Sequence, residues 1–197
     1  MINKLSAKFT EKLLLRQSIT EEERELYIYG FFILLSNLMY IILASLSGLL
    51  LGCFLENIVF YIAFQFIRRY AGGYHASTET RCEIISTLSI ISSIIVIRLS
   101  KQYDFQNILL VVTLVSAIII FCICPLDTPE KPLSEKEFKF FRKKSRLILI
   151  IIISVVIISY FLKLSFLIAP CCISLIFESL LLVCGKMKSR LRYFFKS

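Results

Sequence analysis

RRYAGGYHASTETRC, residues 68–82, is a polar stretch between two apolar runs, residues 54–67 and 84–97. It holds His75, the single histidine of the chain, and ends on Cys82, at the start of the second run. A thiolate beside an imidazolium is an activated nucleophile, so the stretch is a candidate catalytic site. The plain alternative is a surface histidine and an inert cysteine in apolar surroundings.

The composition places this stretch in a membrane protein. Of 197 residues, 57% are hydrophobic, and the mean hydropathy is +0.79. A chain of this size and composition needs lipid as part of its solvent. We therefore predict an all-α membrane protein, folded as a single polytopic domain over residues 1–197. Because the net charge of +9 gathers at the ends of apolar runs, it predicts membrane orientation rather than nucleic-acid binding.

Six apolar segments are long or apolar enough to enter a bilayer. They are residues 28–51, 54–67, 84–97, 107–124, 147–162 and 164–184. The second and third segments are short, and the second carries Glu56, Asn57 and Gln65. The pattern predicts about six transmembrane or half-inserted helices; four full spans with two half-inserted segments are the alternative.

The N-terminal region, residues 1–25, is amphipathic. Ile2, Leu5, Phe9 and Leu13 recur at helical spacing among lysines, which is typical of a helix in the membrane interface or of one packed on protein. The following Thr20-Glu21-Glu22-Glu23 predicts a capping box at the start of the next helix.

Basic residues are unevenly distributed along the chain. If the N-terminus is cytoplasmic and all six segments cross, 20 of the 23 Lys and Arg residues lie on the cytoplasmic side. The exceptions are Arg98, Lys101 and Lys163. The positive-inside rule therefore predicts that both termini, residues 68–82 and the basic loop 125–146 are cytoplasmic.

The seven cysteines predict neither a disulfide framework nor a metal site. Their number is odd, and most lie inside apolar runs. Cys122-x-Cys124 and Cys171-Cys172 lack further ligands at zinc spacing. We expect no metal and no cofactor.

The local sequence indicates how His75 and Cys82 come together. The Gly72-Gly73 pair breaks the preceding helix, and Thr80-x-x-Glu83 is typical of a capping box. With Thr80 as N-cap, Cys82 is the second residue of the next helix, where free N–H groups and the helix dipole favour a thiolate. Seven residues of straight helix would separate the two Cα atoms by about 10 Å, so we predict a helix break between them.

A third, orienting group is less defined. Glu79 is nearest in sequence, although a solvated loop carboxylate is its more ordinary role. Asp127 and Glu178 are the other candidates, and Glu56 shares their ambiguity. Glu178 lies inside the last apolar run, where an ionisable side chain is costly and suggests function. The sequence leaves this choice open.

Residues 68–76, RRYAGGYHA, followed by Cys82, closely resemble the signature of the accessory gene regulator B (AgrB) family. These are bacterial membrane cysteine endopeptidases of peptide quorum sensing. The chain length, the basic N-terminal region and the lysine-containing Pro125–Pro132 segment extend the resemblance over most of the chain. The resemblance implies a bacterial cell-membrane protein, expected to be a homodimer. Its implied catalytic pair is His75 and Cys82, and its arginine and glycine positions fall on Arg68, Arg69 and Gly73.

The resemblance also implies a substrate, a short AgrD-like propeptide with an amphipathic leader, a central Cys or Ser and an acidic tail. Cys82 would attack the bond before the tail, with His75 as base and then acid, and the substrate's own side chain would convert the thioester into a cyclic thiolactone or lactone. From charge alone, we expect the tail to bind a basic cluster. Its members are Lys131, Lys136, Lys139, Arg142, Lys143 and Lys144. Lipid-headgroup binding is the alternative for this loop.

The competing hypothesis is a non-enzymatic membrane protein, a small transporter or an exporter subunit. It would require intramembrane charges along a pathway, and Glu56 and Glu178 are the two candidates. A receptor or scaffold would require a soluble sensing part, for which the sequence leaves little room.

Overall fold

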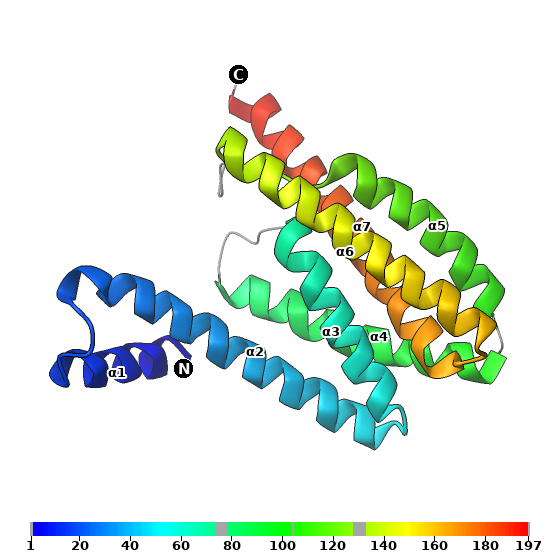
Figure 1. Ribbon diagram of the computed structural model, residues 1–197, viewed down its shortest axis with the longest axis horizontal. Coiled ribbons are helices and arrows are strands. Elements are labelled where there is room, and N and C mark those ends of the chain that lie inside the picture. The colour runs from blue at the N-terminus through cyan, green and yellow to red at the C-terminus, as the bar shows by residue number, and fades with distance from the viewer. Residues whose placement is uncertain (1, 74–78, 104, 128–132, 197) are drawn as a thin grey trace. The chain divides into compact units, whose positions relative to one another are not determined.

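The computed structural model is helical over most of the chain that it describes, residues 2–73, 79–103, 105–127 and 133–196, with residues 79–82 and 191–196 described by their backbone alone. The elements are α1 (Ile2–Leu15), η1 (Glu21–Glu23), α2 (Arg24–Leu50), α3 (Phe54–Ala71), α4 (Glu79–Tyr103), α5 (Gln106–Ile123), α6 (Glu135–Phe161) and α7 (Ser165–Lys196) (Figure 1). The all-α prediction is confirmed.

The chain divides into two compact units, Met1–Leu43 and Ala44–Ser197. In the N-terminal unit, the ring of Phe9 on α1 lies 5.7 Å from that of Phe31 on α2. Ser6 and Thr10 are buried, whereas Leu5 and Phe9 stay exposed. The exposed apolar side chains of α1 suit a membrane interface, whereas its contact with Phe31 is packing on protein, so the interfacial role of residues 1–25 stays a prediction. The predicted capping box forms, since the Glu23 carboxylate accepts a hydrogen bond from the Thr20 backbone at 3.0 Å.

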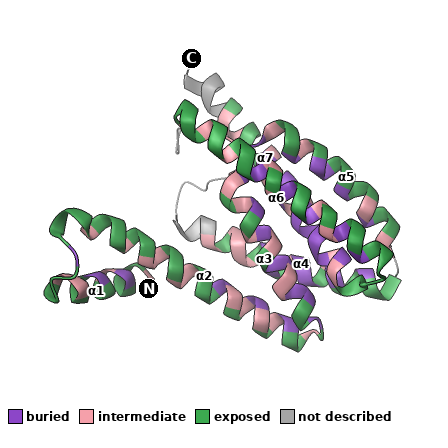
Figure 2. Cartoon of the chain, in the orientation of Figure 1, coloured by how far each residue is buried: buried purple, intermediate pink, exposed green. Residues whose placement is uncertain are grey.

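In the C-terminal unit, α3 and α7 supply much of the core. Helix α3 packs against α4, α6 and α7, and α7 also packs against α5. The buried surfaces of α3, α6 and α7 face inward, while their outer surfaces are exposed (Figure 2). Bulky side chains such as Phe60, Ile173 and Leu182 are fully buried between these helices.

Polar side chains lie inside this bundle. The Asn57 side-chain amide of α3 donates to the Ala44 carbonyl at 2.8 Å and to the Ser47 hydroxyl at 3.0 Å, both on α2. The Ser93 hydroxyl of α4 donates to the side-chain oxygen Oδ1 of Asn57 at 3.4 Å. Hydrocarbon offers no hydrogen-bond partners, so polar groups are placed where neighbouring helices satisfy them.

Within the described part of the chain, five helical segments are long and apolar enough to cross a bilayer, in agreement with a multi-pass membrane protein. They are Glu21–Leu50, Glu83–Tyr103, Gln106–Ile123, Glu135–Phe161 and Ser165–Arg190. The third apolar segment of the sequence is thus part of a full-length helix rather than a short insertion. Helix α3 is the exception, because it carries more polar and charged residues. Its position among three other helices accommodates them, since Glu56 and Asn57 are buried against protein.

Two sequence predictions of helix boundaries are corrected. The basic half of the predicted loop 125–146 is helical, because Ser134 caps α6 and accepts a hydrogen bond from the Glu137 N–H at 3.3 Å. Helix α4 already includes Glu79, so Thr80 is not its N-cap and Cys82 is not its second residue. The start of α6 was placed by its apolar run and the start of α4 by a single capping motif, and neither cue alone locates a helix boundary.

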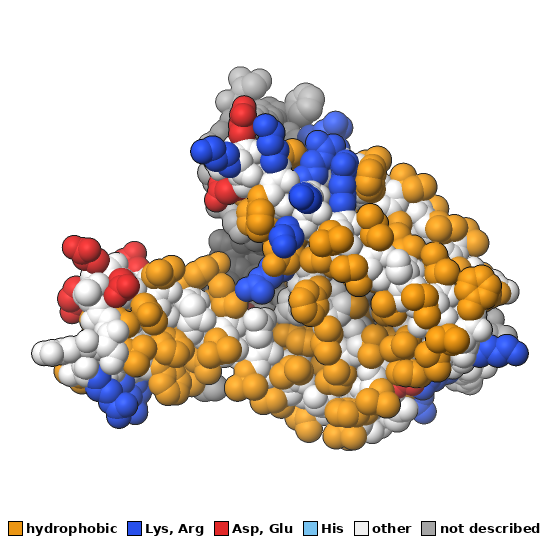
Figure 3. All heavy atoms as spheres, viewed as in Figure 1, with side chains coloured by type: hydrophobic (Ala, Val, Ile, Leu, Met, Phe, Trp, Pro, Cys, Tyr) orange, Lys and Arg blue, Asp and Glu red, His pale blue; other side chains and the backbone are white. Residues whose placement is uncertain are grey.

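The two ends of the C-terminal unit differ in charge. One end, here called the Arg68 end, consists of residues 68–73, 124–127 and 133–146, and Lys and Arg side chains gather over the start of α6 there (Figure 3). The opposite end, here called the Glu56 end, consists of residues 53–57 and 98–103. There Lys101 of α4 forms an ion pair with Glu56 of α3.

Candidate functional site

The candidate site begins where α3 ends. The Gly72 N–H donates to the Arg68 carbonyl at 3.2 Å, and the chain then leaves the helix with φ of 81° at Gly72 and 133° at Gly73. These positive values favour glycine, because a side chain would strain the backbone there. The predicted interruption after the second apolar segment is therefore confirmed at Gly72-Gly73.

His75 lies outside the described residues, and Cys82 is described only by its backbone. Cys82 is the fourth residue of the described part of α4. His75 follows Gly73 by two residues, which keeps their Cα atoms within about 7 Å of each other. The predicted helix break between His75 and Cys82 falls on residues outside the description and stays a prediction.

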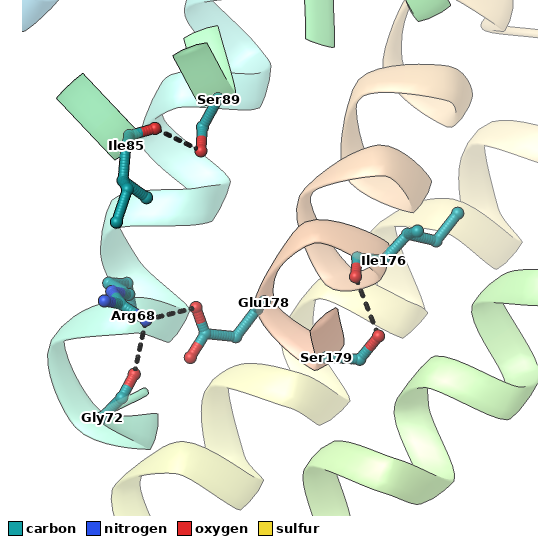
Figure 4. A network of polar contacts seen from close by, with 7 residues as sticks. All are labelled: Arg68, Gly72, Ile85, Ser89, Ile176, Glu178 and Ser179. Atoms are coloured by element: carbon teal, nitrogen blue, oxygen red, sulfur yellow. Dashed lines mark hydrogen bonds and ion pairs between the residues drawn. The ribbon is translucent and has the colours of Figure 1, made fainter. Parts of the chain in front are cut away.

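Arg68 links the end of α3 to the last helix. Its Nη1 donates to the Gly72 carbonyl at 3.1 Å and lies 3.7 Å from Oε2 of Glu178 on α7 (Figure 4). A side chain on Gly73 would collide with the same guanidinium group. Three of the residues singled out from sequence, Arg68, Gly73 and Glu178, are thus brought together.

The segment after α5 is hydrogen-bonded to the end of α3. The Leu126 N–H donates to the Ala71 carbonyl at 3.0 Å, and a Cβ on Gly72 would approach the Leu126 carbonyl oxygen to 3.3 Å. The Tyr70 ring of α3 lies 6.2 Å from the Phe141 ring of α6. The end of α3, the start of the 124–134 segment and the start of α6 therefore meet beside the candidate catalytic stretch.

A cavity of about 190 Å³ lies at this meeting point. Arginine side chains and aromatic or aliphatic side chains share its lining, which includes Arg69, an exposed residue. The remaining lining residues are Arg68, Tyr70, Gly72, Pro125, Leu126, Leu133 and Phe141. Such a mixed pocket suits a peptide segment that carries both apolar and anionic groups.

The basic cluster lies mainly on the first turns of α6. Lys136, Lys139, Arg142, Lys143 and Lys144 are all exposed, whereas Lys131 lies outside the described residues. Lys139 and Lys143 are four residues apart and so share one face of the helix. Glu79 is described only as part of the α4 backbone, and its role as an orienting carboxylate stays a prediction.

Four of the other six cysteines are poorer nucleophile candidates because they are buried, whereas Cys122 and Cys184 are exposed. Cys53, Cys124, Cys171 and Cys172 are buried, and each is a free thiol. Burial, with a smaller contribution from the nearby Glu178 carboxylate, raises the pKa of the Cys124 thiol above its ordinary range. Among the described residues, no group of three His, Cys, Asp or Glu side chains could hold a metal ion.

Sequence reasoning missed two contacts that shape the site. The hydrogen bond from Leu126 to Ala71 joins backbone atoms of segments far apart in sequence, and no side-chain pattern signals it. The Ser134-x-x-Glu137 capping box that starts α6 was visible in the sequence and could have been found. Glu178 was identified as a candidate, but its partner was not.

Comparison with known proteins places this architecture in a family. The model of the family described as accessory gene regulator B matches residues 2–182. A putative AgrB-like protein of Clostridium perfringens is 32% identical over 168 residues, covering 81% of this chain and 77% of the relative. The accessory gene regulator protein B of Staphylococcus intermedius is 27% identical over 149 residues, which cover 75% of this chain and 78% of the relative. No solved structure matches the chain significantly.

Proposed function

Because the chain belongs to the accessory gene regulator B family of quorum sensing, we propose that it is a membrane cysteine endopeptidase that processes an AgrD-like propeptide. The observation that carries the proposal is the junction at Gly72-Gly73, where Arg68 fixes the exit of the chain from α3 next to a cavity. Residues 1–197 act in this proposal as one polytopic domain. Its parts are the interfacial region 1–25, the catalytic stretch 68–82 and the basic segment 125–146.

In the first step, His75 removes the proton of the Cys82 thiol, and the sulfur attacks the carbonyl carbon of the peptide bond before the acidic tail. The bond to nitrogen breaks, and His75 returns its proton to the leaving amine. The tail departs, and the remaining peptide is held as a thioester on Cys82. The position of Cys82 among the first residues of α4 supports this role, because the helix dipole favours a thiolate there.

In the second step, a cysteine or serine of the bound peptide attacks the thioester. Its proton passes through His75 to the sulfur of Cys82, which leaves as the free thiol, and the peptide is released as a thiolactone or lactone ring. A thioester retains acyl-transfer potential that hydrolysis would destroy, so limited access of water favours cyclisation. The reaction requires no metal and no cofactor.

The basic cluster on α6 supports recognition of the acidic tail. Its exposed side chains lie on the helix whose Phe141 lines the cavity, so a tail bound there would extend from the catalytic stretch. The gathering of basic residues at the Arg68 end also supports a cytoplasmic position for this end. We extend the proposal to the homodimer expected of the family and to cytoplasmic termini.

The test compares Cys82→Ala with Cys171→Ala in cells that express an AgrD-like propeptide. Only Cys82→Ala is expected to abolish cleavage, because Cys171 is buried within α7. Mass spectrometry of the wild-type protein should then detect a propeptide fragment joined to Cys82. Cleavage by Cys82→Ala at the wild-type rate would refute the proposal.

The transporter hypothesis has weaker support. Its two candidate pathway charges are each engaged within the protein, Glu56 with Lys101 and Glu178 with Arg68.

A further inference from the structure

Glu178 is an unusual residue in its surroundings. It lies within α7, a helix apolar enough to span the membrane, and its side chain is 0% exposed. Neither carboxylate oxygen accepts a hydrogen bond within the described part of the chain. Because an ionisable group in this environment is costly, its retention calls for a partner that makes use of the charge.

Arg68 is that partner, and it has a second contact. The same Nη1 atom lies 3.7 Å from the Glu178 carboxylate and donates to the Gly72 carbonyl at 3.1 Å. Figure 4 shows the guanidinium group between the two, with Glu178 on one side and Gly72 on the other. The position of this nitrogen therefore depends on both the α7 carboxylate and the backbone that leaves α3.

The backbone at this point has little other freedom. Gly73 lies so close to the Arg68 guanidinium that a Cβ there would collide with it, and a Cβ on Gly72 would come within 3.3 Å of the Leu126 carbonyl oxygen. His75 is three residues from Gly72, within about 10 Å along the chain.

We infer that Glu178 is a positioning residue that acts through Arg68 to hold the Gly72 carbonyl, where the chain leaves α3 three residues before His75 in the sequence. This inference rests on the proposed function and deepens it. Glu178 touches neither substrate nor the reacting atoms; it holds the guanidinium group that holds the Gly72 carbonyl. Misplacement of a reacting group by about 1 Å can reduce a rate about 100-fold, so a fixed exit from α3 has catalytic value.

The test uses the full-length protein in proteoliposomes with a synthetic AgrD-like propeptide that has an amphipathic leader, a central cysteine and an acidic tail. In Glu178→Gln the charge is lost while the shape is kept. We expect kcat to fall about 10- to 100-fold, with KM unchanged within about twofold because the exposed basic cluster is untouched. Glu178→Asp, which keeps the charge but shortens its reach, should have an intermediate kcat.

A second measurement reports on the catalytic pair without substrate. Alkylation of Cys82 by iodoacetamide at pH 6.5, followed on its peptide by mass spectrometry, depends on thiolate that His75 stabilises. Glu178→Gln should slow this alkylation about tenfold, since a free thiol is mostly protonated at that pH. A role in packing alone would leave the rate constant unchanged in the folded protein.

Glu56→Gln is the matched control, because Glu56 is also a buried glutamate paired with a basic residue. It should retain kcat and the Cys82 alkylation rate. The inference is overturned if Glu178→Gln keeps both wild-type values, if it raises KM alone, or if Glu56→Gln loses kcat equally.

A folding defect in Glu178→Gln would be addressed by Arg68→Met/Glu178→Met, in which an apolar pair replaces the charges. Such a replacement of a buried ion pair is often neutral for stability, so the double variant should be folded but should show the reduced kcat. A wild-type kcat in the double variant would overturn the inference.

His75→Ala and Cys82→Ala separate the positioning role of Glu178 from the proposed peptidase function. If they retain cleavage, the proposed function itself fails, whereas loss in them and normal rates in Glu178→Gln reject only the positioning role.

Discussion

The Glu56 end and the Arg68 end of the C-terminal unit each bury a glutamate beside a basic residue, yet the two pairs are built differently. Lys101 is 47% exposed, and its ion pair with Glu56 joins α4 to α3. Arg68 is 21% exposed, its carboxylate partner is fully buried, and it also holds the Gly72 carbonyl. The two pairs therefore differ in that Arg68 also binds irregular backbone, the feature on which the proposed positioning role of Glu178 rests.

The largest expected effect is on propeptide cleavage, which should depend on His75 but not on a residue at the Glu56 end. His75→Ala should reduce cleavage about 10 000-fold, the loss typical of removing a general base that serves a nucleophile. Cys53→Ala, at the Glu56 end, should leave cleavage unchanged because Cys53 is a buried free thiol remote from this role. Product formation from the synthetic propeptide would be quantified by mass spectrometry. Equal losses in the two variants would show that the ends do not differ in function.

The next effect concerns stability. Arg68→Met leaves the fully buried Glu178 without its counter-charge and should lower the free energy of unfolding by about 3–5 kcal/mol. Lys101→Met should cost less, about 1 kcal/mol, because Lys101 is partly solvated. Thermal or denaturant unfolding in detergent measures both. A larger cost for Lys101→Met would reverse the order that burial predicts.

A smaller effect tests the backbone beside each pair. Gly73→Ala places a Cβ against the Arg68 guanidinium at a positive φ, and should reduce kcat about 10- to 30-fold by displacing the chain. Gly52→Ala has the same kind of strain, with φ of 67°, but its Cβ would meet nothing within 4 Å. It should cost about 1 kcal/mol of stability and leave kcat unchanged. Equal kcat in the two variants would remove the special role of the Gly73 contact.

The smallest effect concerns substrate binding. Lys139→Gln/Lys143→Gln removes two charges from one face of α6 and should raise KM about fivefold at low salt, and less at 0.5 M salt, where screening is stronger. Lys163→Gln, between α6 and α7, is the control and should leave KM unchanged. The steady-state kinetics of propeptide cleavage at both salt concentrations provide the measurement. A salt-independent change in KM would argue against electrostatic recognition of the tail.

The fold was largely predictable because hydropathy reports where helices cross lipid. The runs at 107–124 and 164–184 correspond to α5 and to the membrane-spanning part of α7, and Pro125 follows the end of α5 as predicted. Hydropathy does not report where a helix begins in water. The start of α6 was therefore missed, although Ser134 carries the capping signal.

The candidate site was predictable in its residues but not in its contacts. Glu178 was suspected because a charge is rare in an apolar run, and Arg68 because of the family signature. Their pairing depends on how α3 packs against α7, which no local pattern encodes. The meeting of Ala71 with Leu126 is likewise a product of tertiary packing.

The hydrogen bond from Leu126 to Ala71 joins two segments through main-chain atoms alone. Almost any amino acid except proline at position 126 can supply that donor, because proline lacks the N–H group. The side chain of Leu126, which lines the cavity, is therefore not needed for this hydrogen bond. A substitution at this position can therefore change the lining of the cavity while the hydrogen bond between the two segments is kept.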